Sequence, residues 1–241
     1  MRKADEKALL VCGAAELFSR VAEVCKFRGL AGDKQRHIRD MRSVMMQILL
    51  LWCCLPMLSA ATIVCLGDSL TAGKGLEEDQ AYPALVESLA RADGLDWRVT
   101  NAGVSGDTSA AGLRRLNWIL KAKPEVLFIA LGANDGLRGQ SVEALSSNLT
   151  SIIEKCRAAG TTVFMSGIQI PTNYGEDYRL AFAAVFPGVA QQHQVPLMPF
   201  LLEGVGGVPV LNQADGIHPT AEGQQQMATR VYAFLKPLIV K

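Results

Sequence analysis

Two short segments, far apart in the chain, contain the three side chains that serine-dependent acyl transfer requires. Ser69 follows the apolar run 62–66 in the sequence Gly-Asp-Ser-Leu, and Asp215 and His218 lie three residues apart in Asp-Gly-Ile-His-Pro. A histidine can take the proton of a serine hydroxyl, and a carboxylate can hold that histidine in the tautomer it needs. These residue types predict a nucleophilic Ser69, with His218 as its base and Asp215 as the orienting carboxylate.

Each of these residues also has a structural interpretation. Ser69 stands between a predicted strand and a predicted helix, where a serine commonly caps the helix. Asp215 can likewise cap the last predicted helix, for which Pro219 is a suitable first residue. The serine occurs together with a distant Asp–His pair, and this combination favours catalysis. By contrast His193, which ends a helical pattern among glutamines, is predicted to be structural.

An acyl-transfer site also needs hydrogen-bond donors for the oxyanion of the tetrahedral intermediate. The predicted donors are the Ser69 N–H, the Gly106 N–H and the Asn134 side-chain amide, each of which follows a predicted strand. Glycine at 106 lets the backbone approach a substrate closely. Asn134 alone is equally typical of a turn, but its place among the other elements favours catalysis. The neighbouring Asp68 and Asp135 are expected to hold loop shape by hydrogen-bonding the backbone.

From residue 62 onward, short apolar runs alternate with longer helical patterns. Strands are predicted at 62–66, 97–101, 126–131, 162–168 and 195–198. Helices are predicted at 81–92, 108–121, 141–159, 177–193 and 219–236. Continuous apolar strands that alternate with helices indicate a parallel sheet covered on both faces, and therefore a doubly wound, three-layer α/β/α domain. The loops that follow the strands meet at one edge of such a sheet, so polar groups far apart in sequence can share a site.

The composition excludes several other classes of protein. The chain has 241 residues, of which 49% are hydrophobic and 20% charged. A chain of this size can bury a stable core without the help of disulfides or bound metals. Residues 62–241 carry 14 Lys and Arg against 17 Asp and Glu, without a basic run, which argues against nucleic-acid binding. Their two cysteines, Cys65 and Cys156, are expected to be buried free thiols, although spacing leaves a bridge open. No Cys/His cluster has metal-ligand spacing, so no metal site is expected.

The N-terminal part has the pattern of a secretory signal peptide. Residues 44–58 are apolar, preceded by Arg42 and followed by small residues. The run is shorter than the about 20 residues that a membrane span needs. We therefore predict a signal peptide at 41–61 and a catalytic domain at 62–241. Residues 1–40 are then an upstream extension, either translated or the result of a start codon placed too early. The alternative is a translated chain in which the apolar run stays as an N-terminal membrane anchor.

These motifs resemble those of the SGNH, or GDSL, hydrolase superfamily. Its four sequence blocks occur in order at residues 67–70, 106, 132–135 and 215–219. The resemblance covers essentially all of 62–241 and is most specific for the bacterial group of arylesterase, thioesterase I and lysophospholipase L1. Stretches similar to that group lie at 81–85, 132–139, 171–175 and 201–205. The resemblance implies a flavodoxin-like sheet of five parallel strands, the catalytic and oxyanion-hole roles given above, no cofactor, and a periplasmic or secreted location.

The resemblance also implies an activity. It predicts a serine esterase that hydrolyses carboxylic esters, and thioesters or lysophospholipids, through an acyl-enzyme on Ser69. We expect small-molecule substrates, a monomer, no nucleic-acid partner and no stable membrane span after processing. From their position after the fourth strand, Ile168, Ile170 and Pro171 are predicted to line an acyl groove. Lys74 departs from the family, in which an aromatic residue often follows Ala-Gly, and this leaves the substrate details open. The alternatives are a carbohydrate acetylesterase of the same superfamily and a non-catalytic binding domain.

Overall fold

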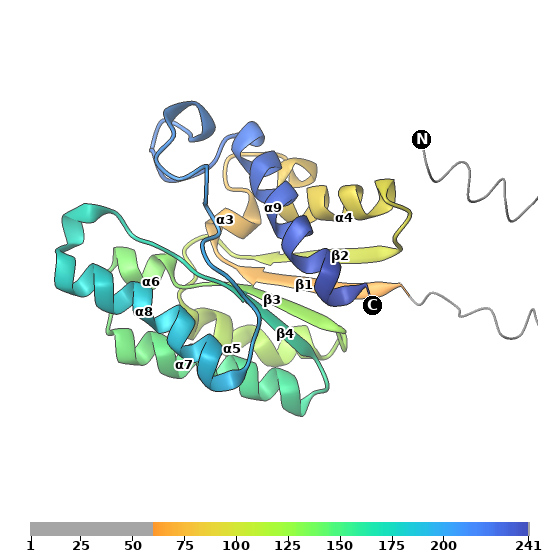
Figure 1. Ribbon diagram of the computed structural model, residues 1–241, viewed down its shortest axis with the longest axis horizontal. Helices are drawn as coiled ribbons and strands as arrows, with labels where there is room; N and C mark the ends of the chain where they lie inside the picture. The colour runs from red at the N-terminus through yellow and green to blue at the C-terminus, as the bar shows by residue number, and fades with distance from the viewer. Residues whose placement is uncertain (1–59, 241) are drawn as a thin grey trace, which may run out of the picture. The chain divides into compact units, whose positions relative to one another are not determined.

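Five parallel strands form the centre of the domain (Figure 1). The computed structural model describes residues 60–240. The sheet has the order β2-β1-β3-β4-β5, and its strands are β1 (Ala61–Gly67), β2 (Trp97–Gly103), β3 (Val126–Ala130), β4 (Thr162–Ser166) and β5 (Leu197–Met198). All four neighbouring pairs are parallel. The central strand β3 is buried along its whole length, which explains why its sequence is a continuous apolar run.

Helices cover both faces of this sheet. The α-helices are α3 (Ser69–Ala72), α4 (Tyr82–Ala92), α5 (Ser109–Leu120), α6 (Ala133–Leu137), α7 (Val142–Ala158), α8 (Glu176–His193) and α9 (Ala221–Ile239). Three short 3₁₀ turns are η1 (Glu78–Gln80), η2 (Thr172–Tyr174) and η3 (Pro209–Leu211). Helices α4 and α9 pack together on one face, and α5, α7 and α8 pack in a row on the other (Figure 1). This arrangement confirms the predicted three-layer α/β/α, flavodoxin-like fold.

Several predicted boundaries differ from those observed, for example those of β2, which extends to Gly103, and of β5, which begins at Leu197. The last helix was expected to begin at Pro219, but α9 begins at Ala221, because the Thr220 hydroxyl caps it by accepting from the Gly223 N–H. Pro219 instead forms an isolated antiparallel bridge with Asn212, and this part of the prediction was wrong. The fourth strand ends at Ser166, so the residues after it form a loop rather than two more strand positions.

The two short helices α3 and α6 were not predicted as complete elements. Each has too few residues for a periodic apolar pattern, and such helices depend on tertiary packing for their stability. A buried Gln224 on α9 supplies part of that packing for α3. Its side-chain amide donates to the Leu70 carbonyl at 3.0 Å, and its side-chain oxygen accepts from the Tyr82 N–H at 2.9 Å. One glutamine therefore joins α3, α4 and α9.

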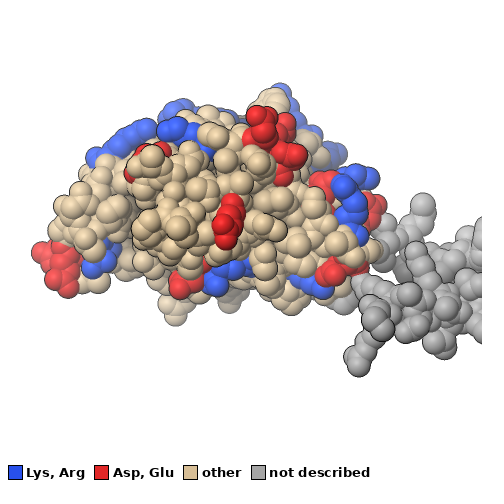
Figure 2. Space-filling model, turned by 90° about the horizontal axis from the view of Figure 1, so that it is seen from above, with Lys and Arg blue, Asp and Glu red and all other residues tan. Residues whose placement is uncertain are grey.

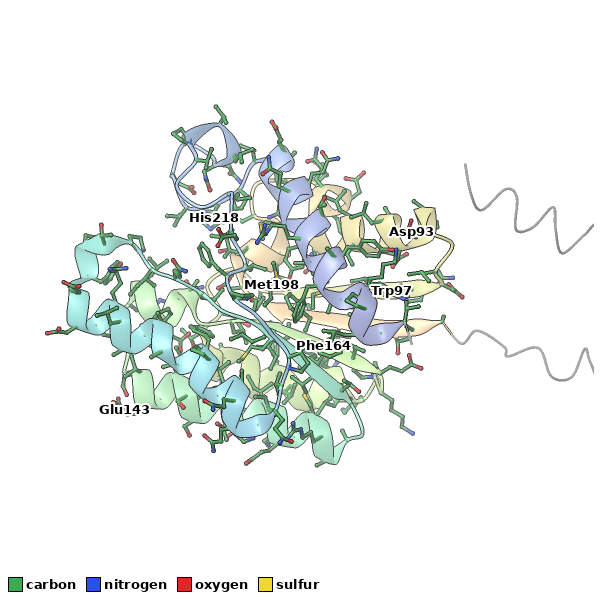
Figure 3. All side chains as sticks on the ribbon, in the orientation of Figure 1. Asp93, Trp97, Glu143, Phe164, Met198 and His218 are labelled. Atoms are coloured by element: carbon green, nitrogen blue, oxygen red, sulfur yellow. The ribbon has the colours of Figure 1, made fainter. Side chains whose placement is uncertain are left out.

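The core contains both cysteines of the described residues as free thiols, as predicted. Burial raises the pKa of each thiol, Cys65 and Cys156, to about 12. The fully buried Tyr82 places its hydroxyl 3.0 Å from the Thr71 hydroxyl of α3, so its one polar group is paired. At the opposite end of the sheet from His218, Trp97 begins β2 and packs edge-on against Tyr232 (Figure 3).

Charged side chains are dispersed over the surface. Figure 2 shows one face of the domain, on which most charged side chains lie toward the edges and the middle is largely uncharged. On that face no basic patch of the kind used to bind nucleic acid is visible. No helix within residues 60–240 is both long and apolar enough to cross a membrane. The predicted segments 1–40 and 41–61 lie outside the described residues, apart from the last two positions, and stay predictions.

Close packing of α3 on β2 gives a first testable prediction. A Cβ atom added at Gly103 would collide with the backbone of Ala72 and lie 2.7 Å from the Thr71 carbonyl carbon. Gly103→Ala should therefore displace α3 and lower the free energy of unfolding by about 1–3 kcal/mol, measured by urea denaturation. Gly188→Ala is the control, because a Cβ there meets open space within α8. Equal stability of the two variants would contradict this packing.

Candidate active site

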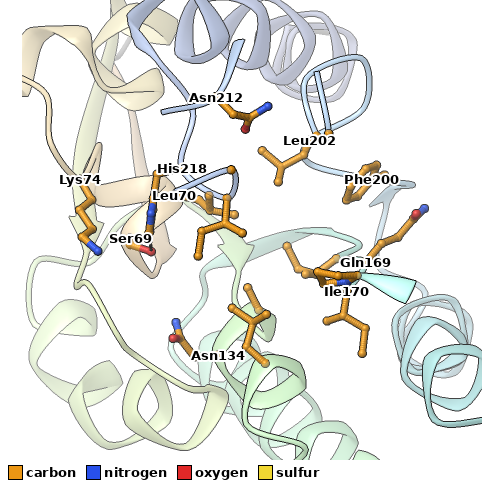
Figure 4. Close-up of a pocket in the computed structure, with 18 of the residues that line it drawn as sticks. Ser69, Leu70, Lys74, Asn134, Gln169, Ile170, Phe200, Leu202, Asn212 and His218 are labelled. Atoms are coloured by element: carbon orange, nitrogen blue, oxygen red, sulfur yellow. Dashed lines mark hydrogen bonds between the residues drawn. The ribbon is translucent and has the colours of Figure 1, made fainter. Parts of the chain in front are cut away.

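The loops that follow the strands meet at the carboxyl edge of the sheet and enclose a cleft of about 710 Å³ (Figure 4). The apolar side chains of its lining are Leu70, Ala133, Leu137, Ile168, Ile170, Pro171, Phe200, Leu202 and Ile217. Its polar and ionisable side chains are Ser69, Lys74, Ser105, Asn134, Gln169, Thr172, Asn212 and His218. The cleft therefore combines a mainly apolar wall with a small number of hydrogen-bonding groups, as ligand sites generally do.

The structure brings the predicted serine, histidine and carboxylate into one chain of hydrogen bonds. His218 Nε2 lies 2.9 Å from Ser69 Oγ, and His218 Nδ1 lies 2.6 Å from Asp215 Oδ2. With the Nδ1 proton donated to the carboxylate, Nε2 is free to accept from the serine hydroxyl. His218 is buried and Ser69 half-buried, so the imidazole is held in place while the hydroxyl faces the cleft.

Hydrogen bonds keep the Asp215 carboxyl ionised. The His218 side chain and the backbone N–H groups of His218 and Ile217 all donate to it, the latter two at 3.0 and 3.1 Å. These bonds lower the pKa of Asp215 to about 2, with the His218 side chain as the largest cause. The turn that contains Asp215 thus fixes the carboxylate against both the backbone and the ring of His218. The helix-capping role considered for Asp215 belongs to Thr220.

The three predicted oxyanion donors line the same cleft. Within residues 60–240, the N–H groups of Ser69 and Gly106 have no hydrogen-bond partner in the protein. Gly106 has a φ of 86°, a left-handed conformation that glycine adopts without strain. The Asn134 side-chain amide, on α6, donates to the Asp107 carbonyl at 3.0 Å and lies 3.4 Å from Asp68 Oδ2. These contacts fix the side-chain orientation of Asn134 at the edge of the cleft.

Buried polar contacts position the helix that contains Asn134. The Asp135 carboxylate accepts from the Ser109 N–H at 2.8 Å and from the Ser109 hydroxyl at 2.6 Å, and the Asn148 amide donates to the same hydroxyl at 2.9 Å. Because Ser109 begins α5 and Asn148 lies on α7, the network joins three helices. Asp68 caps α3 by accepting from the Leu70 N–H at 3.0 Å. Asp68 and Asp135 therefore both accept hydrogen bonds from backbone N–H groups, as predicted.

Arg115 is a positioning residue that the sequence analysis missed. Its Nε donates to the Asp107 carboxylate at 2.7 Å, and its Nη2 donates to the carbonyls of Gly67 and Ala102 at 3.0 and 2.7 Å. One guanidinium therefore joins the ends of β1 and β2 to the loop whose carbonyl holds Asn134. No local motif identifies such a residue, because its role follows only from the placement of α5 over these strand ends.

The predicted acyl-groove residues also lie at the cleft. Ile168 and Ile170 are buried and Pro171 is exposed, and all three belong to the lining. The sequence analysis did not name Phe200 and Leu202 as part of this wall, although the stretch 201–205 contributed to the family resemblance. Among the described residues, no three His, Cys, Asp or Glu side chains are arranged to hold a metal ion.

Comparison with known proteins shows the family. Residues 65–226 match the model of the GDSL-like lipase/acylhydrolase family. The chain belongs to this family. Over 182 residues it is 47% identical to the esterase TesA of Pseudomonas aeruginosa, a match that covers 75% of this chain and 90% of that protein. It is 38% identical over 182 residues to the thioesterase 1/protease 1/lysophospholipase L1 of Escherichia coli, covering 75% of this chain and 86% of that protein.

Solved structures of GDSL-like proteins support the same assignment. The crystal structure of TesA has a TM-score of 0.71 and covers 74% of this chain and 99% of that one. The psychrotrophic esterase EstA from Pseudoalteromonas has a TM-score of 0.72 at 34% identity, covering 75% of this chain and 100% of that one. The chain is therefore a serine esterase of the GDSL-like family that acts on carboxylic esters of small molecules. These relatives do not favour the carbohydrate acetylesterase or the binding domain.

The buried Asp68 gives a pH-dependent prediction. Burial raises the pKa of its carboxyl from 3.8 to about 6, although the hydrogen bond from Leu70 lowers it. The folded state therefore binds this proton more tightly than the unfolded state. As the pH rises from about 4 through about 6, the free energy of unfolding falls. The loss is on the order of 3 kcal/mol. Urea denaturation at about pH 4 and pH 7 should show this loss in the wild type and a smaller one in Asp68→Asn. An equal loss of unfolding free energy in the wild type and in Asp68→Asn would contradict the raised pKa of Asp68.

Proposed function

We propose that the esterase works through an acyl-enzyme on Ser69, with His218 as general base and then general acid and Asp215 as the orienting carboxylate. The observation that carries this proposal is the pair of hydrogen bonds on His218, 2.9 Å to Ser69 Oγ and 2.6 Å to Asp215 Oδ2. As Ser69 attacks the ester carbonyl, its proton passes to Nε2, and the ionised Asp215 stabilises the imidazolium that forms. His218 then protonates the departing alcohol, and water activated by the same ring releases the acid.

The Ser69 and Gly106 N–H groups and the Asn134 amide are proposed to bind the oxyanion. The two backbone donors have no partner among the described residues, so they can bind the oxyanion without giving up another hydrogen bond. The Asn134 amide is held by the Asp107 carbonyl at 3.0 Å, and its longer 3.4 Å contact with Asp68 is the one that an oxyanion would replace. The esterase EstA was solved in a form inhibited by monoethylphosphonate. Because the tetrahedral phosphorus of a phosphonate resembles the tetrahedral intermediate of acyl transfer, this inhibition of a relative supports the same mechanism here.

The apolar wall supports an acyl chain of medium length as the group transferred. Ile170, Phe200 and Leu202 extend the cleft away from Ser69 (Figure 4), and Ile168 also belongs to its lining. A preformed apolar groove of this kind binds alkyl chains by removing them from water. Aryl esters, thioesters and lysophospholipids all present such a chain. The names of the relatives from Pseudomonas aeruginosa, Vibrio mimicus and Escherichia coli span esterase, arylesterase, thioesterase and lysophospholipase.

We also propose that the enzyme is exported and acts as a monomer. Export rests on the signal-peptide pattern at 41–61, which predicts a periplasmic or secreted mature chain, with an uncleaved anchor as the alternative. A monomer is sufficient for the proposed activity, because one chain supplies every proposed catalytic and oxyanion group. Detection of the processed N-terminus in a periplasmic or culture fraction tests the first proposal, and gel filtration tests the second.

Replacement of the serine gives the first functional test. Ser69→Ala should abolish turnover of p-nitrophenyl esters from acetyl to dodecanoyl, because no nucleophile remains within reach of His218. The wild type should show its optimum at a medium chain length, measured as kcat/KM across the series. A circular-dichroism spectrum and an unfolding curve like those of the wild type establish that the variant is folded. Turnover retained by folded Ser69→Ala would remove Ser69 from the mechanism.

Removal of the side-chain oxyanion donor gives a second test. Asn134→Ala should lower kcat on the order of 100-fold with little change in KM, because the donor acts on charge present only in the transition state. Asn117→Ala is the matched control, since Asn117 is an exposed asparagine on α5. A loss in kcat below about threefold for Asn134→Ala would exclude this amide from the oxyanion hole.

A further inference from the structure

Lys74 is unusual among the residues of the cleft. It is the one Lys, Arg, Asp or Glu side chain among the described residues that line it. The side chain is exposed, and within residues 60–240 it has no ion-pair partner. The cleft thus contains a positive charge without a lining carboxylate to balance it. Because an unbalanced charge at a cleft attracts ligands of opposite sign, the observation favours an anionic group on the substrate.

The main chain of Lys74 is fixed on both sides, whereas its side chain is free. Its N–H donates to the Ser69 carbonyl at 3.1 Å, and its own carbonyl accepts from the Gln213 side-chain amide at 2.8 Å. The flanking residues Gly73 and Gly75 have φ values of 71° and 83°, which let the chain turn tightly between these contacts. The ammonium group is therefore attached to a backbone position that is hydrogen-bonded to Ser69 and to the loop before Asp215.

The side chain lies at the end of the cleft opposite the acyl wall. In Figure 4 it lies beside Ser69 and His218, while Ile170, Phe200 and Leu202 lie on the other side of these two residues. If the acyl chain of a bound ester occupies the apolar wall, its alcohol portion extends toward Lys74. His218, which must protonate the leaving oxygen, lies next to that portion. The two ends of the cleft thus differ in chemistry, one apolar and one cationic.

A second cation contacts a loop that lines the cleft. Arg138 is exposed, and its Nη2 donates to the Gly106 carbonyl at 3.0 Å, so the guanidinium lies against the loop of a proposed oxyanion donor. Asp215 is the carboxylate of the site, but it is already hydrogen-bonded to His218 and is absent from the lining. The acidic residues Glu77, Glu78 and Asp79 follow Lys74 in the chain, but they are exposed and, like Asp215, absent from the lining. Lys74 is therefore the one Lys, Arg, Asp or Glu side chain that a ligand in the cleft meets.

We propose that Lys74 forms a leaving-group subsite that binds a phosphate a few bonds from the ester oxygen. This inference rests on the proposed function, since it takes Ser69 as the attacking group. Phosphate occurs in two sources of substrate, glycerophospholipids and acyl-coenzyme A. In a lysophospholipid only the glycerol carbons separate the phosphate from the ester, whereas in acyl-coenzyme A the pantetheine arm does. Because Lys74 lies in the same cleft as Ser69 and its backbone is hydrogen-bonded to that residue, the shorter spacing fits better.

The test compares substrates with and without their phosphate-bearing portion. One pair is octanoylglycerol phosphate and octanoylglycerol, and the other is octanoyl-coenzyme A and octanoyl-pantetheine, all below their micellar concentrations. Lys74→Ala should lower kcat/KM for octanoylglycerol phosphate about two- to fivefold, the range expected for loss of an exposed ion pair. The same change should leave kcat/KM for octanoylglycerol unchanged. Lys74→Glu should lower kcat/KM for octanoylglycerol phosphate further. The preference of the wild type for the phosphorylated member should also decline with added salt.

Lys121→Glu is the matched control, because it makes the same change in net charge at an exposed position at the end of α5. A loss confined to octanoyl-coenzyme A would support the cationic subsite but overturn its assignment to a glycerophosphate. Equal effects of Lys74→Glu on both members of each pair, or none on either, would overturn the subsite itself. Failure of the proposed function is separate, because it appears as turnover of the neutral octanoylglycerol by folded Ser69→Ala.

Discussion

The hydrogen bond between His218 and Ser69 joins residues 149 positions apart, and much of the domain maintains it. Ser69 lies at the start of a four-residue helix, which has no stability of its own. The amide of Gln224 holds that helix through the Leu70 carbonyl, and the Tyr82 hydroxyl holds it through Thr71. Since Gln224 belongs to α9, the helix that follows His218 also anchors the helix that begins at Ser69. A single element therefore controls the spacing of the two partners.

The oxyanion side of the cleft depends on buried charge. Arg115 joins the ends of two strands to the Asp107 loop, and Asp135 joins the short α6 to the first residue of α5. Asp68 lies completely buried beside Ser69, where desolvation raises the pKa of its carboxyl to about 6. Burial of such groups costs free energy, and hydrogen bonds offset only part of it. What these groups supply is fixed orientation, which an oxyanion site needs before charge develops.

The sequence was sufficient for those parts of the molecule that depend on local pattern. Continuous apolar runs located the strands, the alternation of strands and helices determined the layers, and the motifs around Ser69 and His218 identified residues that the fold brings together. The sequence was not sufficient where contacts between distant segments determine the structure. The start of α9 was displaced by two residues because Pro219 pairs with Asn212, and Arg115 and Phe200 became visible only when their elements were placed around the cleft. Short helices such as α6 lack the length to show a period.

The two buried thiols have a consequence for the compartment in which the enzyme works. Disulfide exchange proceeds through the thiolate, and because burial raises the pKa of both thiols to about 12, they are almost entirely protonated at neutral pH. Neither Cys65 nor Cys156 is therefore a target for oxidants once the core has closed around it. The native domain keeps the same covalent structure in a reducing and in an oxidising environment. Its vulnerable interval is the time before folding is complete, when both thiols are open to mispairing.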